Sequence, residues 1–342
     1  MKKKNIVTIG GGTGSFVLLS GLKNYPVNIS AIVSMTDSGG STGILRDELG
    51  VLPPGDVRQC LVALSDSSIT LRKLMNYRFG GGSLRGHNFG NLFLSALEKI
   101  EGSFSDGVEK AGKILNVGGE VIPVTEDNVE LYMELKNGEI LDEEKKISTD
   151  LSIEKIGIKK YCLRPRARAN PGAVKAILEA DVIVIGPGNH YSSVMPNLLV
   201  GGIAEAIVKS KAKVIYNSNL VNKKGQTEKF HLDDYVDAVN NALGAKRINF
   251  VTYNVKRPNM KLIAKYNRQR ESLVEFCGED RANRKYKVVL ADLLGARIPR
   301  YSKDDAIASR RSFIRHDGNK LAVVIMTIAE REGNGSLIKE IV

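Results

Sequence analysis

Two glycine-rich loops near the start of the chain contain the residue types that bind phosphate groups. Gly10–Ser15 reads Gly-Gly-Gly-Thr-Gly-Ser, and Asp37–Gly43 reads Asp-Ser-Gly-Gly-Ser-Thr-Gly. Glycines allow tight turns and expose backbone N–H groups, and such groups at the start of a helix attract an anion. Neither loop matches the P-loop pattern or the spacing of a dinucleotide-binding fingerprint. The two loops predict a site for a phosphorylated small molecule, above all a nucleotide.

Asp37, the acidic residue of the second loop, is the candidate for chemistry at this site. Its carboxylate can hold a ribose hydroxyl, as an acidic residue does in dinucleotide-binding folds. It can also bind a divalent cation such as Mg²⁺, or orient a substrate hydroxyl. A plain turn or helix cap is the alternative without function. Asp56, in a Pro-Pro-Gly-Asp turn, is a more distant carboxylate that reads more simply as a helix N-cap.

Further loops show the same combination of glycines and polar side chains. Gly80–Gly90 precedes a helix with Asn91 in its first turn, and its His87 reads as a hydrogen-bonded histidine rather than a general acid or base. Gly186–Ser193 and Asn217–Asn219 each follow an apolar run that predicts a strand. Ligands of open parallel sheets bind at the carboxyl ends of the strands. Loops of this kind that recur at one sheet edge are hard to explain as turns alone.

The elements that must position these loops are alternating strands and helices. Apolar runs, each followed by a polar loop, alternate with segments of helical periodicity, which is the pattern of a Rossmann-like α/β fold with a mostly parallel sheet and helices on both faces. Pro196–Lys209 predicts one continuous helix, and Asp317 is the expected N-cap of the last helix. The predicted strands of this sheet include Asn5–Ile9, Ile29–Met35, Asp181–Ile185, Lys213–Tyr216 and Asn249–Tyr253.

The middle of the chain departs from this alternation. Residues 118–165 predict a small inserted antiparallel β region, with a hairpin signal at Asn137-Gly138. Asp142–Ile147 reads as a charged, exposed stretch of this region. Because no flexible linker or repeat is evident, we expect residues 1–342 to form a single α/β domain that contains the insertion. The strand patterns of the inserted region are Glu120–Pro123, Val129–Leu135 and Lys155–Leu163.

Composition and charge narrow the class of protein. The 50 Lys and Arg against 38 Asp and Glu leave a net charge of +12, which favours anionic ligands. The basic residues are spread along the chain without interleaved aromatic residues, so no nucleic-acid partner is expected, and the run Lys159–Arg168 predicts a solvated basic surface. Three separated cysteines without a CxxC motif predict neither a disulfide framework nor a zinc site. No apolar stretch approaches the roughly 20 residues of a membrane span, and we expect a cytoplasmic protein.

Six motifs distributed along nearly the whole chain resemble a known family. The sequence is similar to the CofD-like superfamily, and specifically to its bacterial gluconeogenesis-factor (YvcK) branch. The combination of LPPGD with VALSD, and of GPG with YSSVMPNLLV, is highly specific. The motifs are Ile9–Gly14 (IGGGTG), Asp37–Leu49 (DSGGSTGILRDEL), Leu52–Asp66 (LPPGDVRQCLVALSD), Gly86–Phe93 (GHNFGNLF), Gly186–Val200 (GPGNHYSSVMPNLLV) and Arg315–Asp317 (RHD).

This resemblance implies a Rossmann-like fold and a nucleotide-type ligand. For the gluconeogenesis-factor branch, the implied ligand is UDP-N-acetylglucosamine and the implied role lies in cell shape and in growth on gluconeogenic carbon sources. For the CofD branch proper, the implied reaction transfers a phospholactyl group from a guanosine diphosphate donor to a deazaflavin precursor, with magnesium. Carried over by motif, the ligand-binding residues are Gly11, Gly12, Thr13, Gly14, Asp37, Ser38, Gly39, Gly40, Ser41, Asn91, Gly188, Asn189, Asn219, Tyr266 and Arg315.

Two loops depart from the family's usual sequence. The usual Asn-Leu-Met-Thr-Gln-Pro-Gly-Glu-Thr run is replaced by the run Asn219–Thr227, and the usual Ser-Leu-Tyr-Thr-Ser run by Asn189–Ser193, with His190 in place of leucine. Both loops belong to the expected ligand site. The fold is therefore better determined than the base and sugar of the ligand.

Three functions from different classes remain. The first is a regulatory protein that binds a sugar nucleotide. The second is a magnesium-dependent transferase with Asp37 near the metal or the acceptor, and the third, an NAD-dependent oxidoreductase, is the weakest because neither glycine pattern fits it. The sequence leaves open whether the protein catalyses a reaction. A homodimer, the commonest assembly of soluble homo-oligomers, is the expected oligomer if there is one.

Overall fold

A seven-stranded parallel sheet forms the centre of the computed structural model, which describes residues 3–276, 284–296 and 313–330. Its strand order is β10-β9-β8-β7-β1-β2-β3, and all its neighbouring strands run parallel. The predicted Rossmann-like sheet is confirmed. The strands are β1 (Asn5–Gly10), β2 (Asn28–Val33), β3 (Glu120–Pro123), β7 (Val182–Ile185), β8 (Lys213–Asn217), β9 (Phe250–Asn254) and β10 (Lys287–Ala291).

The strand order reverses at β1. β2 and β3 lie on one side of β1, and β7 and the later strands lie on the other. Ile6 pairs with Val182 across the junction, and β7 is buried along its whole length. Such continuous burial is typical of a parallel strand that helices cover on both faces. The boundary between β1 and β7 is therefore the topological switch point, where open α/β sheets form their ligand crevice.

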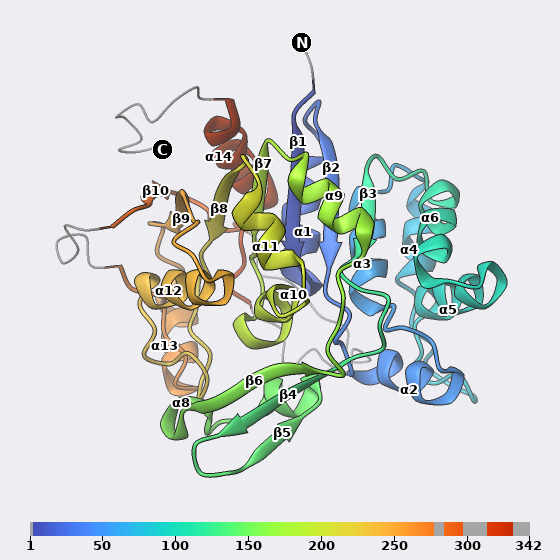
Figure 1. The fold of residues 1–342 in the computed structure, drawn as a ribbon, viewed down its shortest axis with the longest axis horizontal. Coiled ribbons are helices and arrows are strands. Elements are labelled where there is room, and N and C mark those ends of the chain that lie inside the picture. Colours follow the sequence, from blue (N-terminus) through green and yellow to red (C-terminus); the bar gives the residue numbers. More distant parts are fainter. Residues whose placement is uncertain (1–2, 277–283, 297–312, 331–342) are drawn as a thin grey trace.

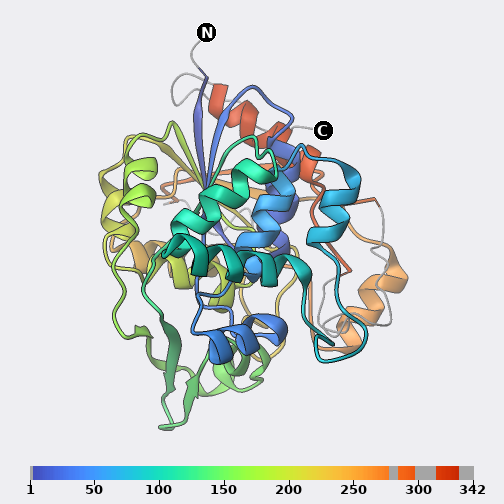
Figure 2. The ribbon, with the colours of Figure 1, turned by 90° about the vertical axis from the view of Figure 1, so that its right-hand side faces the viewer.

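Helices cover both faces of the sheet (Figures 1 and 2). On one face α1 packs against α3 and α14, and α5 and α6 pack against each other beside them. On the other face α11 packs against α9 and α12. The helices of the first face are α1 (Gly12–Leu22), α3 (Gly55–Leu64), α4 (Ile69–Met75), α5 (Phe89–Glu101), α6 (Phe104–Ile114) and α14 (Gly318–Glu330); those of the second are α9 (Pro171–Leu178), α10 (Met195–Leu198), α11 (Ile203–Lys209) and α12 (Leu232–Leu243).

The predicted continuous helix over Pro196–Lys209 is wrong. The chain instead forms a short π-helix, η1 (His190–Val194), then α10, and then α11 after a break that includes Gly202 at φ 104°. The prediction for the last helix is correct, because Asp317 Oδ1 accepts the N–H groups of Asn319 and Lys320. Two further helices, α2 (Gly40–Leu49) and α13 (Met260–Arg268), lie near the carboxyl edge of the sheet (Figure 1).

The antiparallel insertion is smaller than expected. The strand Glu120–Pro123, which the sequence placed inside it, pairs with β2 as the edge of the main sheet. A three-stranded antiparallel sheet follows, in the order β5-β4-β6, and Gly138 at φ 88° makes its predicted hairpin turn. This sheet lies beyond the carboxyl ends of the main strands (Figure 1). The insertion comprises β4 (Glu130–Leu135), β5 (Ile140–Asp142), α7 (Glu144–Thr149), α8 (Ile153–Ile156) and β6 (Ile158–Arg164).

Candidate functional site

The first glycine loop and the loop after β7 touch at the switch point. A Cβ atom at Gly14 would lie 2.1 Å from the carbonyl oxygen of Pro187, which is far inside van der Waals contact. β1 and β7 are neighbouring strands, so both loops leave the sheet at its carboxyl edge. Glycine is therefore required at position 14 by the close approach of the two loops, which meet at the carboxyl edge of the sheet.

The N-terminus of α1 faces a carboxylate of the protein itself. Asp56 lies in the first turn of α3 and accepts a hydrogen bond from the N–H of Gly12. A Cβ atom at Gly11 would lie 2.3 Å from Asp56 Oδ2. The expected N-cap role of Asp56 is wrong, because Pro54 caps α3. The Asp56 carboxylate thus lies where a phosphate was expected to bind at the N-terminus of α1. A phosphate bound there would be repelled by the negative charge of this carboxylate.

Asp37 approaches the same place from the end of β2. Its Oδ1 accepts the N–H of Gly39 at 2.9 Å, and a Cβ atom at Gly55 would lie 2.6 Å from its Oδ2. Burial raises the pKa of Asp37, although its hydrogen bonds and the charge of Arg58 oppose the shift. The pKa of Asp56 is raised well above its usual value, first by burial and then by repulsion from Asp37 and Glu144.

Glu144, a third carboxylate, reaches the site from the insertion, and the sequence analysis missed it. It begins α7, in the stretch Asp142–Ile147 that was expected to be exposed. Its half-buried carboxylate accepts hydrogen bonds from the hydroxyls of Ser192 and Ser148. Burial, and then the nearby charge of Asp37, raise the pKa of Glu144 to about 7. The one local signal was Ile147, which is fully buried and marks an inward helix face.

Arg58 places a positive charge behind these carboxylates. It is only 8% exposed, and its Nε donates to Asn91 Oδ1 at 2.9 Å. Asn91 Nδ2 in turn lies 3.4 Å from Ser41 Oγ, and Nδ1 of His87 lies 3.3 Å from the same oxygen. His87 is thus the hydrogen-bonded histidine that the sequence predicted. Through these hydrogen bonds, Asn91 and Ser41 hold the loop that contains Asp37 against the buried side chain of Arg58.

The other predicted residues of the first two loops also lie at this edge. Thr13 is half-buried in the first turn of α1. Ser38 Oγ accepts the N–H of Lys145 at 3.1 Å, which ties the loop to the insertion. Gly39 caps α2, and Gly40 has a positive φ of 52° with open space around its α-carbon. The structure therefore brings the two glycine loops together, as predicted.

The loops after β7 and β8 form the opposite wall. Asn219 Nδ2 donates to the carbonyl of Gly188 at 3.0 Å, and Asn189 Oδ1 accepts the N–H of Ser192 at 3.3 Å. Buried polar atoms without a partner are rare in proteins and mark places that water or a ligand fills. Within the described ranges, atoms of this kind here are Oδ1 of Asn197 and Asn219, Nδ2 of Asn217 and both ring nitrogens of His190.

Tyr266 and Arg315 come from the C-terminal part of the chain. Tyr266, in α13, is 4% exposed, and its hydroxyl accepts the N–H groups of Phe313 at 2.7 Å and Ile314 at 3.3 Å. Tyr266 thus holds the segment that leads into Arg315. Arg315 is half-buried, and its neighbour His316 hydrogen-bonds to the backbone of Ser218, which places the segment beside the loop after β8.

Among the residues with described positions, no three His, Cys, Asp or Glu side chains form a group that could hold a metal ion by themselves. This does not conflict with a Mg²⁺ site of one or two carboxylates, because that ion is commonly completed by waters and substrate phosphates. Cys60 and Cys162 are free thiols, while Cys277 lies outside the described residues. The described helices include none with the length and apolar character of a bilayer span.

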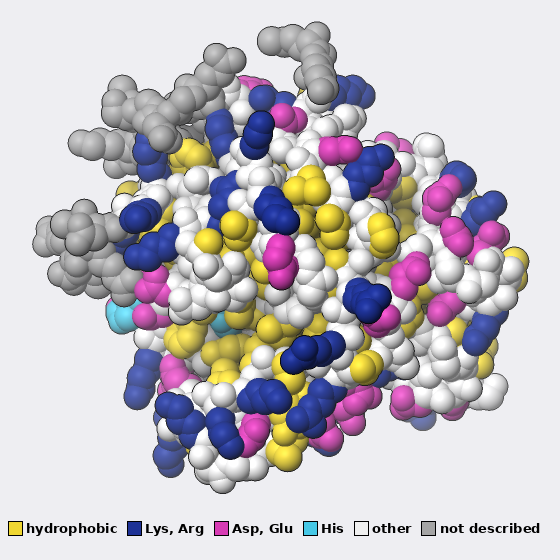
Figure 3. Space-filling model, viewed as in Figure 1, with side chains coloured by type: hydrophobic (Ala, Val, Ile, Leu, Met, Phe, Trp, Pro, Cys, Tyr) yellow, Lys and Arg dark blue, Asp and Glu magenta, His cyan; other side chains and the backbone are white. Residues whose placement is uncertain are grey.

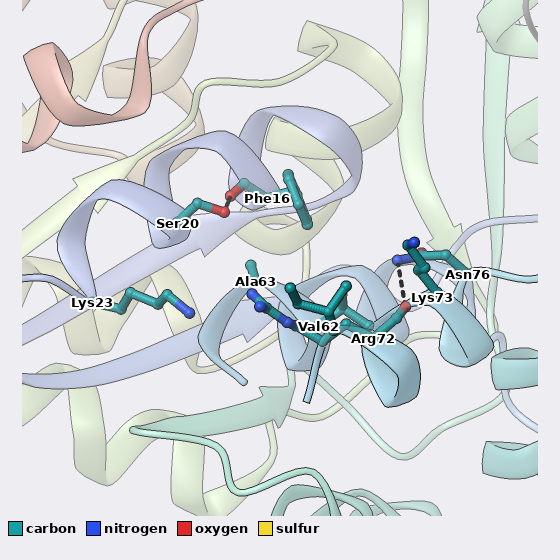
Figure 4. Close-up of a pocket in the computed structure, with 9 residues that line it drawn as sticks. Phe16, Ser20, Lys23, Val62, Ala63, Arg72, Lys73 and Asn76 are labelled. Atoms are coloured by element: carbon teal, nitrogen blue, oxygen red, sulfur yellow. Dashed lines mark hydrogen bonds between the residues drawn. The ribbon is translucent and has the colours of Figure 1, made fainter. Parts of the chain in front are cut away.

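A depression in the surface, called here the second depression, lies away from the candidate site. It has a volume of about 420 Å³ and lies between α1, α3 and α4, where Phe16, Val62 and Ala63 meet Lys23 and Arg72 (Figure 4). Figure 3 shows another charged region, because Lys and Arg side chains gather over the β4–β6 sheet. Lys159, Lys160 and Arg164 of β6 are exposed, as predicted for the basic run. None of the predicted ligand residues lines the second depression.

Comparison with known proteins identifies the family of the chain. Residues 6–294 match the family described as 2-phospho-L-lactate transferase CofD. The gluconeogenesis factor of Bacillus subtilis is 36% identical over 96% of this chain and 98% of its own. The gluconeogenesis factor of Halalkalibacterium halodurans is 42% identical over 79% of this chain and 83% of its own.

A solved structure shows the same fold. The crystal structure of a Bacillus halodurans protein superposes with a TM-score of 0.85 at 36% identity, covering 95% of this chain and 100% of that one. The sequence motifs, the strand order and these similarities all agree. The chain therefore belongs to the CofD family, in the bacterial branch whose members are named gluconeogenesis factors.

Proposed function

We propose that the protein binds a sugar nucleotide, UDP-N-acetylglucosamine, at the switch point of the sheet. The observation that supports this most directly is the pairing of two unlike walls across one edge. Asp37, Asp56 and Glu144 make one wall acidic, and Gly188 and Asn219 join in the other. A sugar nucleotide can pair with both walls. Its sugar has hydroxyl donors for the carboxylates, and its diphosphate accepts hydrogen bonds from N–H donors.

Electrostatics orients the ligand in this proposal. A diphosphate beside these carboxyl groups would be disfavoured, because its negative charge repels their ionised forms, whose pKa values are already raised. Glu144 reaches the loop after β7 at Ser192, whereas the described contacts of Asn189 and Asn219 include no carboxylate of this cluster. Arg315 follows the segment anchored by Tyr266. We therefore place the phosphates toward the amides and Arg315, and the sugar toward the carboxylates.

The proposed role follows the branch to which the chain belongs. Its relatives are named gluconeogenesis factors, and we propose that ligand binding serves regulation of cell shape and of growth on gluconeogenic carbon sources. A regulatory binder needs no catalytic group. The nearby thiol of Cys60 is buried with a raised pKa, which makes it a poor nucleophile.

A transferase is the second candidate, and one observation favours it. Asp37 and Asp56 lie close enough to repel each other, and two carboxylates with phosphate oxygens suffice for Mg²⁺. Their buried oxygens fit such an ion, which would neutralise phosphate charge when bound. In that case Asp37 and Asp56 would hold the metal, and the protein would move a phosphorus-containing group from a nucleotide diphosphate donor to an acceptor.

A thermal-shift screen separates the two candidates. We expect UDP-N-acetylglucosamine to raise the melting temperature without added magnesium, because binding to the folded state alone stabilises it. Magnesium-dependent release of GMP from a guanosine diphosphate donor, in the presence of an acceptor, would instead support the transferase. No response to any nucleotide would contradict both.

A variant tests the proposed orientation of the ligand. We expect Arg315→Ala to weaken binding of UDP-N-acetylglucosamine while the melting temperature of the ligand-free protein stays nearly unchanged. Unaltered affinity would remove Arg315 from the site.

A further inference from the structure

The inserted helix α7 is attached to three separate loops of the main domain. Its backbone donates from Lys145 N–H to Ser38 Oγ, in the loop after β2, at 3.1 Å. Gln226 Nε2, in the loop region after β8, donates to the carbonyl of Ile147 at 2.7 Å. These contacts fix α7 against the carboxyl edge of the sheet, and the half-buried side chain of Glu144 projects from its first turn.

Glu144 also joins α7 to the loop after β7. Its carboxylate accepts hydrogen bonds from the hydroxyl of Ser192 and from that of Ser148 within its own helix. None of the ion pairs found between described residues includes Glu144, so its charge is balanced only at longer range, by Lys223. Two hydroxyl donors leave part of the acceptor capacity of a carboxylate unused, because a carboxylate offers about four acceptor sites.

The backbone before α7 is strained in a way that suits a functional side chain. Glu143 has a φ of 71°, one of three positive values among the described non-glycine residues. Such conformations cost free energy and persist where the surroundings impose them, commonly at ligand sites. Here the strained residue turns the chain from β5 into α7, and that turn directs Glu144 toward Ser192.

A purely structural role explains this arrangement poorly. A serine or glutamine could bond to the same hydroxyls without placing a negative charge near Asp37 in a partly buried position. Carboxylates with such surroundings are concentrated at functional sites. The unused acceptor positions and the contact with the loop after β7 through Ser192 both suit a ligand that presents hydroxyl or N–H donors.

We infer that Glu144 contacts the ligand and determines which nucleotide sugars the site accepts, by accepting a hydrogen bond from a hydroxyl or N–H group of the sugar. This inference rests on the proposed function, because it requires a sugar nucleotide in the crevice. The insertion would then supply the residue that recognises the sugar, and the main domain would bind the nucleotide.

The test compares two ligands that differ only in the sugar end. Isothermal titration calorimetry gives the affinities of wild type and Glu144→Gln for UDP-N-acetylglucosamine and for UDP. We expect the variant to lose roughly 10-fold or more in affinity for the sugar nucleotide, as for a hydrogen bond to a charged group, and less than about 2-fold for UDP by the same reasoning. Glu143→Gln, at the neighbouring half-buried position outside the carboxylate group, is the matched control and should match wild type with both ligands.

A second variant separates contact from charge. Glu144→Asp keeps the charge but withdraws the carboxylate by one methylene, and we expect the same selective loss for the sugar nucleotide. Equal losses for both ligands, or no loss for either, would overturn the inference while leaving the proposed function standing. If wild type binds neither ligand, the proposed function fails and the inference fails with it. Circular dichroism melting of each variant without ligand confirms that it is folded.

Discussion

The two halves of the sheet bring opposite kinds of polar group to one crevice. On the β1–β3 side, Arg58 donates a hydrogen bond to Asn91, and its positive charge acts on Asp37. The carboxylate of Asp37 accepts the N–H of Gly39 in its own loop. On the β7–β10 side, Asn217 and Asn219 each retain a buried atom without a described partner. The first side is held by hydrogen bonds within the protein, whereas the second side has buried polar atoms with capacity for a water or a ligand. Substitutions should therefore affect folding on the first side and binding on the second.

The largest expected effect is on the preorganised side. Arg58→Ala should lower the free energy of unfolding by about 3 kcal/mol, because it leaves Asn91 Oδ1 without its donor and removes the positive charge facing two buried carboxylates. Urea denaturation measures the change. Arg166→Ala, at an exposed position, is the control and should stay within about 0.5 kcal/mol of wild type. If both variants lost a similar free energy of unfolding, the proposed difference between the two sides of the sheet would be wrong.

The junction between the halves should be nearly as sensitive. Gly14→Ala places a methyl group where only 2.1 Å separates it from the Pro187 carbonyl oxygen, and overpacking of this kind costs about 1–3 kcal/mol. The same denaturation experiment checks it. Gly81, which has open space around its α-carbon and no positive φ, provides the control Gly81→Ala. If both alanine variants were equally stable, the two loops would not be in rigid contact.

A smaller effect of opposite sign is expected at His190. This side chain is 3% exposed, lies among Tyr191, Phe230 and Tyr235, and has no described partner for either ring nitrogen. Because an unbonded buried polar group is costly, His190→Leu should raise the free energy of unfolding by about 1 kcal/mol at pH 7.

The gain at His190 should depend on pH. Burial lowers the pKa of His190 to about 4 from 6.5, so between these values the unfolded state binds a proton that the folded state does not. The stability of wild type therefore falls as the pH falls through this window, and the leucine variant lacks that loss. Denaturation at pH 7 and pH 5 should show a larger gain at pH 5. A pH-independent difference would mean that water or a ligand already satisfies the ring.

The smallest effect on stability is expected at Asn219. Asn219→Ala removes one neutral hydrogen bond, to Gly188, which contributes about 0.5–1 kcal/mol. Binding should suffer more, because the unpaired Oδ1 is lost as well. Melting curves with and without UDP-N-acetylglucosamine measure both quantities. A large loss of stability in the ligand-free protein would place Asn219 with the preorganised half.

Local sequence patterns were sufficient for most of the fold. A strand that meets a glycine loop and a helix can be recognised from neighbouring residues, so β1 and α1 were predicted correctly. The predicted loop Asp37–Gly43 is only partly correct, because α2 begins at Gly40. The strand Glu120–Pro123 was assigned to the wrong sheet, because its pairing with β2 joins residues about ninety positions apart. Membership of a sheet is set by such distant pairing, which no local window contains.

The candidate site was harder to predict for the same reason. Asp56 reads as an N-cap in its own turn, and only the folded chain brings it to the Gly12 N–H. Glu144 lies in a charged stretch whose pattern indicates exposure, and the tertiary contacts of α7 bury it. Tyr266 stays a predicted ligand residue, and the sequence did not show that its hydroxyl also accepts the N–H groups of Phe313 and Ile314.

The pairing of β1 with β7 also constrains how the protein forms during synthesis. Ile6 leaves the ribosome 176 residues before its partner Val182, a delay of roughly 10–35 s at typical elongation rates. During that time β1 can pair with β2 but has an open edge on its other side, and open strand edges promote association between chains. The contact between the loops after β1 and β7 can therefore form only after more than half of the chain has been synthesised.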